Sequence, residues 1–154
     1  MRLPRHITRF VRAACRPAPA GLAAAGLLAA LTAAPVTRAQ EAPALEPVTF
    51  TSAQVSRGRQ LYGGNCASCH GEDLAGLDAP ALSGDFFTHW YGGPVADLFD
   101  YIQIGMPANN PGSLTPVQVA GLVAFILQRN GFAAGDTPLP EDAETLRTIG
   151  FTQP

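Results

Sequence analysis

The amino-acid sequence predicts a small all-α fold, and three observations support this. Three segments repeat their apolar residues at helical spacing, and no segment alternates apolar and polar residues as a strand does. The 154 residues include 16 glycines and 14 prolines, many of them between the helical segments. Because glycine and proline interrupt regular structure, this pattern predicts a single domain of short helices joined by irregular loops.

The first predicted helix extends from about residue 51 to Tyr62. Thr51 or Ser52 can cap its N-terminus, since the side-chain oxygen accepts an N–H that the first turn leaves unpaired. Gly63 and Gly64 are expected to end the helix, because glycine is a poor helix former.

The second predicted helix begins at Pro94, a favoured first-turn residue, and ends at Gly105. Its apolar residues lie three, one and three positions apart and form one stripe, made of Val95, Leu98, Phe99 and Ile102. This stripe predicts that one face of the helix packs on the core.

The third predicted helix has the clearest boundaries. Thr115-Pro116-Val117-Gln118 is a capping box with proline in the first turn, and Asn130-Gly131 ends the helix. A short terminal helix is predicted from Pro140 to Ile149, with apolar residues along one side.

The first 39 residues predict a secretory signal peptide. Five arginines and no acid precede the 11-residue apolar run Gly21–Leu31, and Thr37-Arg38-Ala39 supplies a small-x-small cleavage site. We expect cleavage near Ala39, with cleavage after Ala34 as the alternative. The apolar run is shorter than the roughly 20 residues that span a bilayer. The protein is therefore expected in the periplasm, and at the membrane only if segment 18–36 stays uncleaved as an anchor.

Removal of this leader leaves 115 residues, which make one domain with two short flanking parts. Residues 40–50 contain two prolines and predict a flexible lead-in. Residues 51–133 contain the three main helices. Residues 134–154 form a C-terminal extension with the short helix.

The charge of the processed chain argues against a nucleic-acid partner. All ten basic residues are arginines, and six of them lie in the first 39 residues. Four arginines then remain against twelve acidic residues, which gives a formal charge of −8. Phosphate binding needs clustered lysine or arginine, which the processed chain lacks.

The sequence Cys66-Ala67-Ser68-Cys69-His70 is typical of a c-type haem attachment site. Its two thiols can add to the vinyl groups on one edge of a haem and form thioether bonds. The two-residue spacing presents both sulfur atoms from one turn of backbone, and His70 then lies under the porphyrin as an iron ligand. The motif predicts one haem c, with its iron, per chain.

Two other uses of paired cysteines fit less well. A thioredoxin-like dithiol site should follow a β-strand, whereas a predicted helix precedes Cys66. A structural zinc site usually needs four ligands. As nitrogen or sulfur ligands the processed chain offers only Cys66, Cys69, His70 and His89, and His70 is bonded directly to Cys69.

Met106 is the predicted second ligand of the iron. It is the only methionine after the leader, and it stands in Gly105-Met106-Pro107, a rigid position just after the second helix. A methionine and histidine pair suits electron transfer and raises the reduction potential. Core packing is the alternative for a lone methionine. His89 is a competing candidate for this ligand. The alternative to that role is a surface or hydrogen-bonding histidine.

Residues 50–132 resemble a class I cytochrome c. That family begins with a helix in which a glycine, an aromatic residue and the first haem cysteine are spaced four apart, as Gly58, Tyr62 and Cys66 are here. Its last helix crosses the first with an aliphatic and an aromatic residue three apart, which Leu122 and Phe125 match. The resemblance implies helices wrapped around one covalent haem.

The resemblance also implies roles for single residues. Ala79-Pro80-Ala81-Leu82 matches a family segment in which the proline carbonyl accepts the ring N–H of the proximal histidine and the leucine packs on the haem. Pro80 is thus expected to orient His70, and Leu82 to contact the ring. Met106-Pro107 matches the family's distal ligand. Trp90 is a candidate hydrogen-bond donor to a haem propionate, with a core tryptophan as the alternative.

The function expected from these features is that of a periplasmic carrier of single electrons, not an enzyme. Segments between Met106 and Pro140 resemble cytochromes c that occur with periplasmic quinoprotein alcohol dehydrogenases. This implies redox proteins as partners, with such a dehydrogenase as donor and an oxidase or another cytochrome as acceptor. The alternative is a haem protein whose Met106 is displaced when peroxide or a diatomic gas binds.

Overall fold

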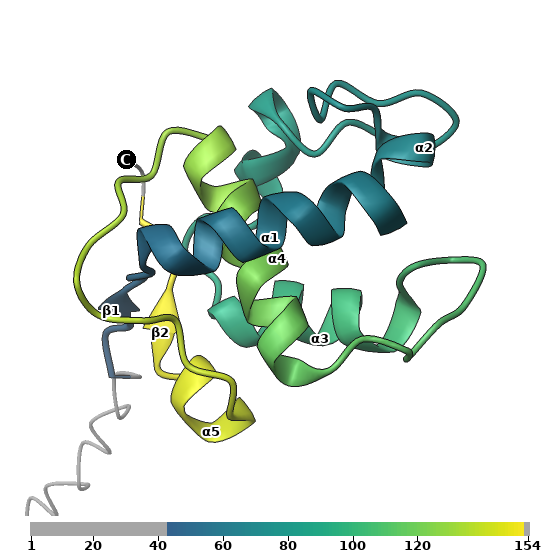
Figure 1. The fold of residues 1–154 in the computed structure, drawn as a ribbon. Helices are drawn as coiled ribbons and strands as arrows, with labels where there is room; N and C mark the ends of the chain where they lie inside the picture. The colour runs from purple at the N-terminus through teal and green to yellow at the C-terminus, as the bar shows by residue number, and fades with distance from the viewer. Residues whose placement is uncertain (1–42, 153–154) are drawn as a thin grey trace, which may run out of the picture. The chain divides into compact units, whose positions relative to one another are not determined.

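The computed structural model describes residues 43–152, so the predicted signal peptide lies outside the described part (Figure 1). The elements in chain order are β1 (Glu46–Pro47), α1 (Ser52–Asn65), α2 (Ala67–His70), the 3-10 helix η1 (Gly84–His89), α3 (Val95–Gly105), α4 (Pro116–Arg129), α5 (Ala143–Leu146) and β2 (Ile149–Gly150). The prediction of a mostly helical fold is confirmed. Within these residues no helix combines the length and apolar character that crossing a bilayer requires.

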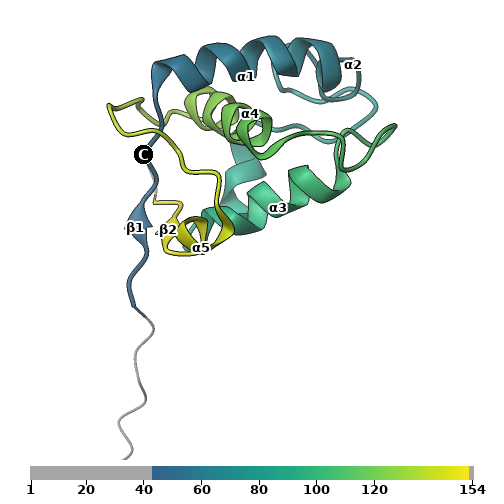
Figure 2. The same ribbon diagram turned by 60° about the horizontal axis from the view of Figure 1, so that its bottom comes forward.

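Helix α4 forms the centre of the fold. It lies between α1 and α3 and contacts both of them (Figures 1 and 2). Every residue from Val119 to Leu127 is buried. Helix α1 crosses α4 at Gly58, and the rings of Tyr62 and Phe125 pack beside this crossing with 5.2 Å between their centroids.

Both predicted N-caps are present. The Thr51 hydroxyl accepts the N–H of Gln54 at 3.3 Å, and Thr115 accepts that of Gln118 at 3.4 Å. In each capping box the glutamine carbonyl in turn accepts the threonine N–H. These side chains satisfy N–H groups that a first turn leaves unpaired, which explains why α1 and α4 begin where the sequence predicts.

Helix α1 is longer than predicted. It continues through Gly63 and Gly64 to Asn65, and the N–H of Cys66 still bonds to the carbonyl of Tyr62 at 2.9 Å. The low helix propensity of the two glycines is outweighed by the packing of the whole of α1 along α4. The extra turn brings the first cysteine of the haem motif to the end of the helix.

Part of the segment expected to be a flexible lead-in forms a strand and packs on the core. Strand β1 pairs with β2 in parallel, with Glu46 opposite Ile149 and Pro47 opposite Gly150. Phe50 follows and is fully buried, and its carbonyl accepts the N–H of Gly135 at 2.8 Å. Backbone pairing between two distant segments leaves no short-range pattern, so the sequence did not reveal it.

The C-terminal extension is part of the core. Leu139, Leu146 and Phe151 are each at most 2% exposed, and the Phe151 ring lies 5.5 Å from that of Phe87 in η1. Its helix α5 covers only four residues of the predicted segment 140–149, because the chain then turns into β2.

Candidate functional site

The haem motif forms a single tight turn after α1. Cys66 ends α1 and begins α2, and its carbonyl accepts the N–H groups of Cys69 at 3.1 Å and His70 at 2.9 Å. The Cys66 side chain is partly buried, while that of Cys69 is exposed. Burial, followed by the charge of Cys69, raises the pKa of the Cys66 thiol to about 11. Before attachment Cys66 is therefore a neutral thiol at neutral pH.

The loop after His70 folds back on the motif. The N–H of Gly76 bonds to the His70 carbonyl at 2.8 Å, and the N–H of Ala79 bonds to the Cys69 carbonyl at 3.0 Å. This path brings the Pro80 carbonyl to 2.7 Å from Nδ1 of His70. Because a carbonyl only accepts, Nδ1 carries the proton and Nε2 is left free to bind a metal.

A cavity of about 610 Å³ opens beside the motif. Its volume is within the roughly 300–1,000 Å³ of typical small-molecule and cofactor sites. It brings together six of the seven predicted site residues, namely Cys66, Cys69, His70, Pro80, Leu82 and Met106. Its apolar lining from the core includes Phe86, Leu98, Ile102, Leu122 and Ile126.

Met106 reaches the cavity from the end of α3. It caps the C-terminus of the helix, its N–H bonds to the carbonyl of Ile102 at 3.0 Å, and its side chain is partly buried. His70 reaches the same cavity from α2. The polar side chains of Tyr101 and Asn109 also line this region. An imidazole and a thioether thus line one largely apolar cavity.

Trp90 and His89 are not among the residues that line this cavity. The Trp90 ring packs on that of Phe86 with 5.9 Å between centroids, which fits the core alternative. His89 is exposed at the end of η1, with Nδ1 3.4 Å from the Thr88 hydroxyl. Residues 43–152 contain no group of three His, Cys, Asp or Glu side chains that could hold a metal ion, so the zinc alternative gains no support.

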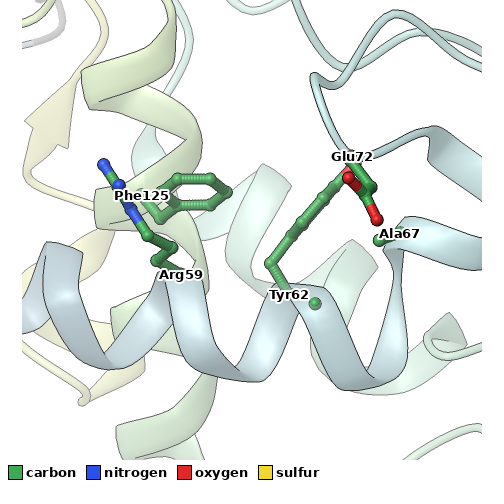
Figure 3. Close-up of a pocket in the computed structure, with 6 residues that line it drawn as sticks. Arg59, Tyr62, Ala67, Glu72 and Phe125 are labelled. Atoms are coloured by element: carbon green, nitrogen blue, oxygen red, sulfur yellow. The ribbon is translucent and has the colours of Figure 1, made fainter.

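Tyr62 is a site residue whose side-chain role the sequence did not show. Its hydroxyl donates to the carbonyl of Gly71 at 2.6 Å, and its ring lines the cavity. The same ring lines a second pocket of about 190 Å³, together with Arg59, Glu72 and Phe125 (Figure 3). The spacing to Cys66 marked Tyr62 as a family aromatic, but only the folded loop places Gly71 within reach of its hydroxyl.

The residues present fit a c-type haem. Two thiols lie in one turn at the cavity, an imidazole has its second nitrogen fixed by a carbonyl, and a thioether shares the same apolar surroundings. Cys66 and Cys69 would hold such a group covalently. His70 and Met106 both line the cavity and are of the types that ligate haem iron.

Comparison with known proteins identifies the same class of protein. Residues 53–126 match the family described as cytochrome C oxidase, cbb3-type, subunit III. The chain is 46% identical over 55 residues to the cbb3-type cytochrome c oxidase subunit CcoP of Rhodobacter capsulatus. That match covers 34% of this chain and 18% of the relative, so the chain spans less than a fifth of its length.

A solved structure is also similar. It is the sulfane dehydrogenase SoxCD from Paracoccus pantotrophus, with 27% identity, a TM-score of 0.48, and coverage of 70% of this chain and 56% of that one. The family match spans α1, the haem motif and most of α4, which are the parts that build the cavity. The chain therefore contains a class I cytochrome c domain, and its cofactor is a covalently bound c-type haem.

Proposed function

We propose that this protein is a periplasmic carrier of single electrons whose haem iron is bound by His70 and Met106. The observation that carries the proposal is that both side chains line one largely apolar cavity beside the two cysteines. Two fixed protein ligands change little in geometry between Fe(III) and Fe(II), which favours electron transfer over substrate turnover. The chain is accordingly proposed to be a carrier and not an enzyme.

The proposed partners are other redox proteins. The relative from Rhodobacter capsulatus is an oxidase subunit, which supports an oxidase or another cytochrome as the acceptor. A periplasmic quinoprotein dehydrogenase is proposed as the donor, on the sequence resemblance. Residues 43–152 carry four arginines and eleven acidic residues, so a partner with a cationic contact surface is favoured by long-range attraction.

The charges of the residues that line the cavity agree with a cationic partner. Asp78 is the only carboxylate among the residues that line the cavity, and none of the four described arginines is among them. Three of those arginines are engaged elsewhere: Arg59 lies over the Phe125 ring, Arg129 bonds to the Asp73 carbonyl, and Arg147 pairs with Asp100.

Optical spectra of the purified protein test the ligation directly. Oxidised protein should be low-spin, with the weak sulfur-to-iron charge-transfer band of a bound thioether, and reduced protein should not bind carbon monoxide. A high-spin spectrum, or immediate binding of carbon monoxide, would contradict the carrier function and favour binding of a gas or peroxide.

A further inference from the structure

The loop that carries Pro80 is fixed at its start by a side chain of α1. Tyr62 is 2% exposed, and its hydroxyl donates to the Gly71 carbonyl at 2.6 Å. Gly71 directly follows His70, and Figure 3 shows the Tyr62 side chain pointing from α1 toward the segment that bears Glu72. Burial, the largest cause, raises the pKa of Tyr62 to about 12, so this donor keeps its proton at neutral pH.

The other end of the loop is fixed by a side chain at the end of α4. Asn130 donates from Nδ2 to the Leu82 carbonyl at 2.9 Å and to the Ile126 carbonyl at 2.8 Å. The N–H of Leu82 is also bound, to the Leu74 carbonyl at 2.8 Å. Both backbone groups of Leu82 are therefore held, two residues after Pro80.

The chain between these two anchors contains no helix or strand. It nevertheless has to hold the Pro80 carbonyl at 2.7 Å from the His70 ring. We propose that Tyr62 and Asn130 are positioning residues for His70, because they clamp the two ends of the loop that supplies its hydrogen-bond acceptor. This inference rests on the proposed role of His70 as iron ligand.

The clamp has a chemical consequence beyond stability. A carbonyl that accepts the Nδ1 proton makes the imidazole a more basic ligand. A more basic ligand favours Fe(III) over Fe(II) and so lowers the reduction potential. Loosening the loop should lengthen the His70–Pro80 bond on average, which raises the potential and exposes the Nδ1 proton to exchange with solvent.

Two variants remove one clamp each, and a third is the matched control. Tyr62→Phe deletes only the hydroxyl and keeps the ring that lines the cavity. Asn130→Ala deletes the amide. Gln54→Ala is the control, because the buried Gln54 amide likewise holds a distant backbone, that of Leu139, through bonds of 2.8 and 2.9 Å. The substitution also removes the glutamine half of the α1 capping box, which lies at the start of the helix and away from Tyr62. Leu139 lies in the C-terminal extension and not in the loop.

The measurements are made on haem-loaded protein. Each clamp variant should have a higher midpoint potential than wild type. Its His70 Nδ1 proton, followed by NMR, should exchange about fivefold faster, the change expected from about 1 kcal/mol of lost restraint. Gln54→Ala should lower the thermal midpoint while potential and exchange stay at wild-type values.

Two outcomes would overturn the inference. In one, the clamp variants lose stability while potential and exchange stay unchanged, which would make both contacts merely structural. In the other, the Gln54→Ala control changes the midpoint potential and the exchange rate of the Nδ1 proton as much as the clamp variants do. If Asn130→Ala retains no haem, Tyr62→Phe decides alone. Failure of the proposed ligation is distinguishable, because it would show in the wild-type spectrum before any variant is compared.

Discussion

Gly58 and Gly121 meet where α1 crosses α4, and the Gly58 position has no room for a side chain. A Cβ on Gly58 would overlap the Gly121 carbonyl oxygen, and a Cβ on Gly121 would lie 3.3 Å from the Gly58 nitrogen. The close approach lets Tyr62, one turn further along α1, reach both the Phe125 ring and the Gly71 carbonyl. The crossing thus determines where the haem motif sits relative to the core.

Gly58→Ala should destabilise the haem-loaded protein by roughly 1–3 kcal/mol or more, because the helices must separate to admit a methyl group. Gly64→Ala is the matched control in the same helix. Nothing lies within 4 Å of the place that a methyl group on Gly64 would occupy, and alanine favours a helix by about 0.5–1 kcal/mol. Chemical denaturation, followed by circular dichroism, measures the free energy of unfolding of both variants. Equal stability of the two variants would show that the helices do not depend on close contact.

Cys69→Ala should leave one thioether bond at most and reduce the yield of haem-loaded protein. The exposed Cys69 and the partly buried Cys66 lie in one turn, so loss of either removes half of the covalent attachment. Mass spectrometry after acid denaturation is the measurement. Wild-type protein should retain the mass of the haem, and a wild-type mass equal to bare polypeptide would refute covalent attachment.

Met106→Ala should abolish the charge-transfer band, open the iron to carbon monoxide and lower the reduction potential. A thioether stabilises Fe(II) more than the water that would replace it. Met106→His is the companion variant, because it should stay six-coordinate while also lowering the potential. Folding should survive both changes, since Met106 is partly exposed and the covalent attachment does not involve it. An unchanged spectrum in Met106→Ala would assign the sixth ligand to another residue.

Tyr62 should make the stability of the protein depend on pH in the alkaline range. Its pKa is raised from 10.0 to about 12, mainly by burial, a cause that persists after Cys66 becomes a thioether. Because the pKa is raised in the folded state, protonated Tyr62 stabilises the folded protein. This contribution is fully present below pH 10 and is lost as the pH rises toward 12. The free energy of unfolding should fall across this window in wild type and fall less in Tyr62→Phe. Parallel curves for the two proteins would contradict this assignment.

Haem-free protein should be largely unfolded. The cavity of about 610 Å³ is lined by core residues such as Leu98, Leu122 and Ile126, which would face empty or hydrated space without the haem. Helices of 11 to 14 residues are marginal alone in water. Circular dichroism of the variant in which both Cys66 and Cys69 are replaced by alanine should show little helix. A cooperative thermal transition in that protein would mean that the polypeptide core suffices.

The sequence predicted those features that depend on residues close together in the chain. The caps at Thr51 and Thr115 and the haem motif are local patterns, and the structure places them as expected. The pairing of β1 with β2 and the contact of Asn130 with Leu82 join residues far apart, and nothing in either segment alone encodes its partner. Tyr62 shows the difference in one residue: its spacing predicted its position, but not its hydrogen bond.

The parallel pairing of β1 with β2 brings the two ends of the domain together. Pro47 enters beside Gly150, and the chain leaves the core one residue later at Phe151. Because the two strands run in the same direction, a tether fused before β1 and one fused after β2 would leave from opposite ends of this strand pair. Moving an anchor from one end to the other should therefore change how the haem cavity is presented to a surface. The orientation of a tethered domain thus depends on which end is attached.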